Sequence, residues 1–118
     1  MMRTSFKLAC VTVTLLLTVG APVSSIAADD AAPAVQMEQG KKLFLSATPA
    51  CALCHTLKDA GSEGAVGPVL DEIKPGSKRV AKALRDGLGN MPSYKTLLTE
   101  EEIAALARYV STATGGVD

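Results

Sequence analysis

Two cysteines and a histidine stand together near the middle of the chain. Residues 51–55 read Cys-Ala-Leu-Cys-His, and His55 is the only histidine among the 118 residues. A Cys-x-x-Cys-His run is the attachment pattern of c-type haem. Each thiol can add to one vinyl group of the porphyrin, and the adjacent imidazole is then held beneath the iron as an axial ligand. The run therefore predicts one covalent haem c, with its iron, bound through Cys51, Cys54 and His55.

Other chemistry for the two thiols fits the sequence less well. A thioredoxin-like redox pair needs a strand followed by a helix, and the surrounding residues lack that pattern. A zinc site needs two further Cys or His ligands, and the only other cysteine is Cys10, in a segment that we expect to be removed. A disulfide between Cys51 and Cys54 is a third alternative, in an oxidising compartment.

The N-terminal residues carry the features of a secretory signal peptide. A basic start with Arg3 and Lys7 precedes an uncharged apolar run at residues 8–19, and small residues follow as far as Ala28. The run is shorter than the ~20 residues of a membrane-spanning helix, which makes an uncleaved anchor the weaker alternative. We expect a signal peptide at residues 1–27, cleavage after Ala27 or Ala28, and export to the periplasm.

The rest of the chain has the length of one small domain. Residues 28–35 are small or charged and contain Pro33, which predicts a flexible leader. Residues 36–114 predict the folded domain, and residues 115–118 a disordered tail. Removing Arg3 and Lys7 from the 12 basic residues leaves 10 against 12 acidic residues, a net charge of −2. This balance indicates no nucleic-acid partner.

Apolar residues recur at helical spacing in three segments. The first predicts a short helix over residues 36–45, and the second follows a turn at Pro75 and ends at Gly87. The third opens at Thr99 with Glu102 three residues later, which is a capping box. No stretch alternates as a strand does, and residues 56–69 are rich in glycine. The sequence predicts an all-α domain with long loops.

Residues 36–112 resemble the class I cytochromes c. The resemblance rests on the attachment motif, on Gly67-Pro68-Val69-Leu70 and on Gly89-Asn90-Met91-Pro92-Ser93-Tyr94. It implies the class I cytochrome c fold, in which three main helices and loops wrap around one covalent haem. It also implies that the Pro68 carbonyl accepts a hydrogen bond from His55 and that Met91 is the second axial ligand, which raises the reduction potential. The weaker alternatives are that Pro68 only ends a loop and that Met91 fills the core.

The two end helices of the domain fit the same resemblance. Gly40 and Phe44 on the first, with Leu106 and Tyr109 on the last, resemble the crossing of the family's terminal helices. We expect Gly40 to allow close backbone approach, and Phe44 and Tyr109 to pack across the crossing.

The resemblance implies an electron carrier and not an enzyme, because His55 and Met91 would fill both axial positions. Its partners would be a periplasmic dehydrogenase as donor and a terminal oxidase or another cytochrome as acceptor, with the free protein a monomer without a membrane anchor. The stretch from Cys51 to Pro68 looks like cytochromes associated with periplasmic molybdenum sulfite dehydrogenases. The alternatives are a haem-containing sensor or gas-binding protein with a weak sixth ligand, and a permanent cytochrome subunit of an enzyme complex.

Five basic residues lie between positions 74 and 85 with no acidic residue among them. Such a surface would attract an acidic partner and accelerate a transient encounter. A plain solvated helix face is the alternative interpretation. The five are Lys74, Lys78, Arg79, Lys82 and Arg85.

Overall fold

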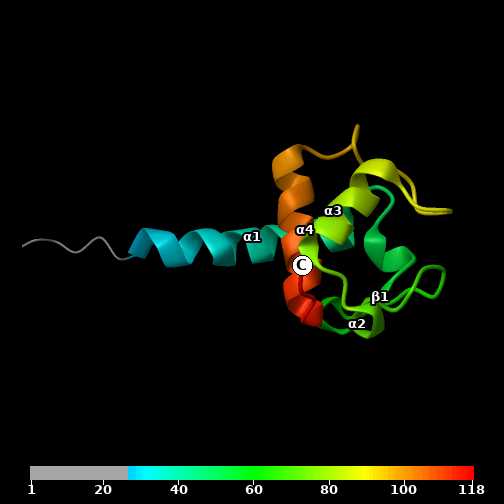
Figure 1. The fold of residues 1–118 in the computed structure, drawn as a ribbon, viewed down its shortest axis with the longest axis horizontal. Helices are drawn as coiled ribbons and strands as arrows, with labels where there is room; N and C mark the ends of the chain where they lie inside the picture. The colour runs from blue at the N-terminus through cyan, green and yellow to red at the C-terminus, as the bar shows by residue number, and fades with distance from the viewer. Residues whose placement is uncertain (1–26) are drawn as a thin grey trace, which may run out of the picture.

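The computed structural model describes residues 27–118. This part of the chain contains four α-helices: α1 (Ala27–Ser46), α2 (Leu70–Ile73), α3 (Ser77–Asp86) and α4 (Glu100–Thr114). Helices α1 and α4 cross, α3 lies beside α4, and the long connection between α1 and α3 forms the other side of the domain (Figure 1). The all-α fold class is thus confirmed. The predicted signal peptide, apart from Ala27, lies outside the described residues.

The crossing of α1 and α4 depends on a glycine. Gly40 is buried, and a Cβ atom at this position would overlap the Ala105 carbonyl oxygen and the Tyr109 Cβ atom. The rings of Phe44 and Tyr109 pack edge to face, with centroids 6.1 Å apart. Both aromatic side chains are almost completely buried. The crossing predicted from these residues is therefore confirmed.

The C-terminal end of α3 and the N-terminal end of α4 lie where the sequence predicts them. In the capping box of α4, the Thr99 hydroxyl accepts from the Glu102 amide at 3.2 Å, and the Glu102 carboxylate accepts from the Thr99 amide at 2.8 Å. Helix α3 ends at Gly87, whose amide donates to the Ala83 carbonyl at 2.8 Å.

Helix α1 includes residues 28–35 as well as the predicted residues 36–45, so the prediction of a flexible leader is wrong for the secondary structure of this segment. The segment is rich in alanine, which is the strongest helix former. Pro33 lies inside the helix. Residues 32–36 are exposed, because this part of α1 projects from the domain (Figure 1).

A small sheet stands where the sequence predicts only loop. Strand β1 (Thr56–Leu57) pairs antiparallel with β2 (Ser62–Glu63), and the 3₁₀ turn η2 (Lys58–Ala60) joins them. Gly61 makes the return with a left-handed φ of 63°, a conformation that glycine adopts readily. Two residues per strand are too few to show alternation in a sequence.

The C-terminal residues pack against the domain, where the sequence predicts a disordered tail. Asp118 folds back onto the start of α3, where its carboxylate accepts from the Ser77 hydroxyl at 2.6 Å and from the Lys78 amide at 2.9 Å. Gly116 packs on the Pro75 carbonyl so closely that a Cβ atom would overlap it. Asp118 thus caps α3 from 40 residues away in the sequence, a contact that no local pattern reveals.

None of the helices within residues 27–118 has both the length and the apolar character needed to cross a lipid bilayer.

We predict that Asp118→Ala lowers the melting temperature at pH 7, because the first turn of α3 loses two hydrogen bonds. The Ser77 hydroxyl, followed by the Lys78 amide, holds the pKa of Asp118 below its ordinary value of 3.8. A lowered folded-state pKa gives stability that is present above the ordinary value and is lost as the pH falls through the folded-state value. The difference from wild type should therefore shrink in acid. Circular dichroism during heating measures the melting temperatures of the variant and of wild type at pH 7 and in acid.

The control is Glu38→Ala, which removes an exposed carboxylate from α1. Equal melting temperatures of Asp118→Ala and wild type at pH 7 would contradict the capping role.

Candidate functional site

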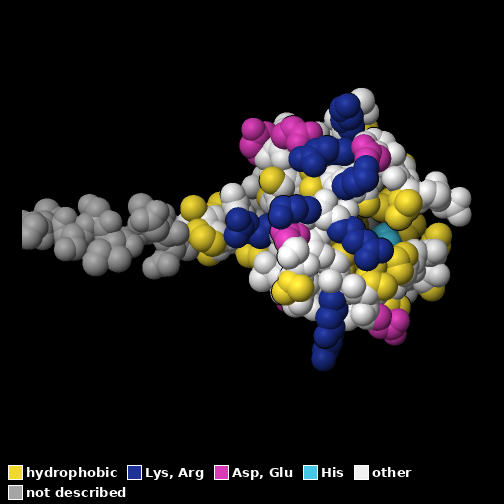
Figure 2. Space-filling model, viewed as in Figure 1, with side chains coloured by type: hydrophobic (Ala, Val, Ile, Leu, Met, Phe, Trp, Pro, Cys, Tyr) yellow, Lys and Arg dark blue, Asp and Glu magenta, His cyan; other side chains and the backbone are white. Residues whose placement is uncertain are grey.

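One cavity gathers the residues that the sequence singles out for chemistry. It has a volume of about 320 Å³, and Cys51, Cys54, His55, Pro68 and Met91 all line it. Its remaining walls are mainly apolar and come from α1, α2, α3 and α4, including Phe44, Leu70, Leu84, Leu106 and Val110. Figure 2 shows the histidine in a hollow that is bordered by hydrophobic side chains. The fold therefore brings the predicted attachment residues and the predicted distal methionine to a single space.

The attachment motif forms a tight turn. The 3₁₀ helix η1 (Cys51–Leu53) directs the amides of Cys54 and His55 to the Cys51 carbonyl, at 3.1 and 2.9 Å. No disulfide joins Cys51 and Cys54 in this structure. Before haem is attached, burial raises the pKa of the Cys51 thiol to about 11.

The imidazole of His55 is oriented by a backbone carbonyl. Its Nδ1 atom lies 2.9 Å from the Pro68 carbonyl oxygen. Since a carbonyl oxygen only accepts, Nδ1 carries the proton and Nε2 is left with a lone pair that can bind a metal. The hydrogen bond that the resemblance implies is present.

Gly67 and Ser62 also position His55, and neither role was predicted from the sequence. A Cβ atom on Gly67 would lie 2.5 Å from Cε1 and 2.8 Å from Nδ1 of His55, so only glycine leaves room for the ring. The Ser62 hydroxyl donates to the His55 carbonyl at 2.9 Å and accepts from the Leu57 amide at 2.9 Å. Gly67 could have been noticed because it precedes Pro68 directly, whereas nothing in the sequence connects Ser62 to His55.

Met91 lies in a tight turn after α3. The amide and carbonyl of Met91 pair with the carbonyl and amide of Leu88, both at 3.0 Å. Gly89 supports the turn with a left-handed φ of 58°. The Met91 side chain is half-buried and packs against the hydrophobic core.

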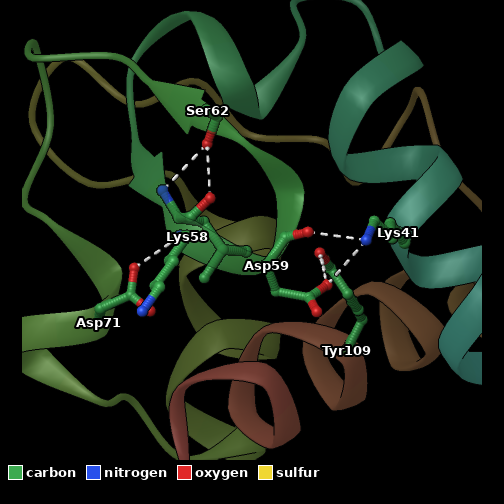
Figure 3. Close-up of polar contacts among 7 residues, drawn as sticks. Lys41, Lys58, Asp59, Ser62, Asp71 and Tyr109 are labelled. Atoms are coloured by element: carbon green, nitrogen blue, oxygen red, sulfur yellow. Dashed lines mark hydrogen bonds and ion pairs between the residues drawn. The ribbon is translucent and has the colours of Figure 1, made fainter.

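A polar cluster connects the loop after His55 to the helix crossing (Figure 3). The Tyr109 hydroxyl of α4 donates to the Asp59 carboxylate at 2.6 Å, and Lys41 of α1 lies 3.2 Å from the same oxygen. Lys41 also donates to the Asp59 carbonyl at 2.7 Å. The Tyr109 hydroxyl first, and Lys41 second, lower the pKa of Asp59. The carboxylate is thus ionised at neutral pH and links α1, η2 and α4.

An all-α domain with a Cys-x-x-Cys-His turn and a methionine in one apolar cavity defines a c-type cytochrome. Over residues 35–110 the chain matches the family described as cytochrome c oxidase, cbb3-type, subunit III, and it belongs to this family. Among solved structures it is similar to the c-type cytochrome SorU from Sinorhizobium meliloti, at 48% identity over 71% of this chain and 97% of that chain, with a TM-score of 0.67. The comparison with curated proteins gives no match.

Membership of this family implies one covalently bound haem c with its iron. The residues present fit that group: two thiols and an imidazole come from one turn, a thioether comes from another loop, and the walls between them are apolar. Within residues 27–118, no three side chains of His, Cys, Asp or Glu form a cluster suited to another metal ion.

We predict that Gly67→Ala destabilises the haem-loaded protein by about 1–3 kcal/mol, as overpacking of a tight site does. The added methyl group pushes the His55 ring away from the Pro68 carbonyl, which makes the imidazole less basic. The reduction potential should therefore rise. Urea unfolding and a spectroscopic redox titration measure the two effects.

Ala65→Ser, a change at an exposed neighbouring residue, serves as the control and should stay within about 0.5 kcal/mol of wild type. A Gly67→Ala protein with unchanged stability and potential would show that the close contact with His55 has no effect on the ligand.

Proposed function

We propose that this protein is a periplasmic electron carrier in which Cys51 and Cys54 attach the haem, while His55 and Met91 are its axial ligands. The observation that supports this assignment most is that these four side chains, from two separate segments, line the same apolar cavity. When bound, haem c supplies an iron that alternates between the ferrous and ferric states and so holds one electron.

The protein residues determine what the site can do. The Pro68 carbonyl and the close packing of Gly67 hold the His55 ring in one orientation. Met91 offers a soft, neutral sulfur that favours the ferrous state. If His55 and Met91 both bind the iron, no position would remain open for substrate or gas. This ligand set therefore favours a carrier over a sensor or a gas-binding protein.

The assignment of Met91 predicts a spectroscopic result. Ferric wild-type protein should show the weak long-wavelength absorbance band of a sulfur–iron bond, and Met91→Ala should lack it. Met37→Leu is the matched control, because Met37 lies on α1, packs against the core and does not line the cavity. A wild-type protein without the band, or a Met91→Ala protein that retains it, would contradict His/Met ligation.

For the electron donor we propose a periplasmic molybdenum-dependent sulfite dehydrogenase, with an oxidase or another cytochrome as acceptor. The resemblance of residues 51–68 to cytochromes associated with such enzymes supports this donor. The same protein could also act as a tightly held subunit, since both roles use one ligand set.

The charged surface near the cavity supports an acidic docking partner. Two of the five basic residues are paired, Lys82 with Asp86 and Arg85 with Glu100, both at 2.6 Å. Arg79 is exposed, lines the cavity and has no carboxylate within 4.0 Å among the described residues. The positive charge that a partner would meet at the cavity thus centres on Arg79.

Mixing the oxidised protein with a sulfite dehydrogenase and sulfite should reduce its haem, at a rate that falls as salt is added, because salt screens the attraction. Arg79→Gln should slow the reaction at low salt. Lys42→Gln, which removes an exposed charge from α1 away from the cavity lining, should not. Stopped-flow absorbance measures the rate, and no reduction of wild-type protein would exclude this donor.

A further inference from the structure

The loop that carries Met91 is held mainly by hydrogen bonds to α3. We define the distal loop as residues 87–98, between α3 and α4. Its amides at Gly87 and Tyr94 donate to carbonyls of α3 at 2.8 and 2.7 Å, and the Ser93 hydroxyl donates to the Arg85 carbonyl. All of these bonds tie the loop to the helix that precedes it, and none reaches the segment with the haem-attachment turn.

One side chain connects the distal loop to that segment. The Tyr94 hydroxyl donates to the Pro49 carbonyl at 2.7 Å, two residues before Cys51. Within residues 27–118 the Tyr94 hydroxyl makes all the hydrogen bonds between the distal loop and residues 47–55, and it also interacts with the Cys51 side chain. The bond therefore joins the two segments that carry the proposed axial ligands.

Tyr94 is buried and its backbone is fixed, which favours a stable hydrogen bond to the Pro49 carbonyl. Its side chain is only 3% exposed and lines the cavity together with Pro49 and Met91. The backbone on its C-terminal side is also fixed, because the amides of Leu97 and Leu98 both donate to the Tyr94 carbonyl at 2.9 Å. Burial raises the pKa of Tyr94 to about 12, so the hydroxyl remains a donor at neutral pH.

We propose that Tyr94 is a positioning residue: its hydrogen bond to the Pro49 carbonyl holds the distal loop against the attachment segment and so keeps the Met91 sulfur on the iron. This inference rests on the proposed role of Met91 as axial ligand. Without the bond the distal loop is held from α3 alone, and conformations in which Met91 has left the cavity become more populated.

Exogenous imidazole measures that population. Imidazole can bind the ferric iron only when Met91 has dissociated, so its apparent affinity rises with the fraction of open protein. Loss of one net hydrogen bond should increase that fraction roughly two- to tenfold. We therefore expect imidazole to bind Tyr94→Phe two- to tenfold more tightly than wild type. Met91→Ala, with no sulfur to displace, sets the upper limit.

Tyr109→Phe is a matched control. Tyr109 is equally buried, and its hydroxyl also makes one short hydrogen bond, to Asp59, but that bond connects α4 to η2 and leaves the distal loop untouched. Both Phe variants keep the aromatic ring and should lose some global stability. Only Tyr94→Phe should bind imidazole more tightly and, on heating, lose the long-wavelength band before its helices unfold.

The possible results distinguish a failure of Met91 ligation from a failure of the positioning role of Tyr94. Absence of the band from wild-type protein would overturn Met91 ligation itself. If wild type has the band but Tyr94→Phe and Tyr109→Phe bind imidazole with the same affinity, Tyr94 has only a structural role and the inference is wrong.

Discussion

The close approach of α1 and α4 at Gly40 is the constraint on which the rest of the domain depends. Because no side chain separates the helices there, Phe44 and Tyr109 can pack edge to face at the crossing. Phe44 and Leu106 then form part of the cavity wall, while the Tyr109 hydroxyl holds Asp59 and, through it, the loop that follows His55. A contact between two backbones thus determines both the wall of the cavity and the position of the attachment segment.

The two sides of the site are held in different ways. His55 is fixed by the Pro68 carbonyl, by Gly67 against its ring and by Ser62 on its backbone. Met91 lies in a turn that is hydrogen-bonded to the attachment segment through one side chain, that of Tyr94. A firmly held imidazole suits an electron carrier, since a rigid ligand moves little between oxidation states, and on the Met91 side the Tyr94 hydrogen bond supplies the corresponding restraint.

The sequence predicted what local patterns encode and missed what distant residues determine. The capping box at Thr99, the turn at Cys51 and the glycine at position 40 carry their structural consequences within a few residues or in a family pattern. Asp118 on α3 and Tyr94 on Pro49 bring together residues 40 and 45 positions apart, so no spacing rule could reveal them. Ser62 lies only seven residues from His55, but its contact depends on the turn between β1 and β2, which the sequence did not predict. The leader was mispredicted because small and charged residues were interpreted as disorder, although the alanines among them favour a helix.

The central claim is that His55 and Met91 together hold the iron of one covalent haem. X-ray absorption at the iron edge of the ferric protein tests this claim most directly, because it counts the sulfur and nitrogen atoms bound to the metal. The account predicts one sulfur neighbour besides the pyrrole and imidazole nitrogens, and its loss in Met91→Ala. An iron surrounded only by nitrogen or oxygen in the wild-type protein would contradict it.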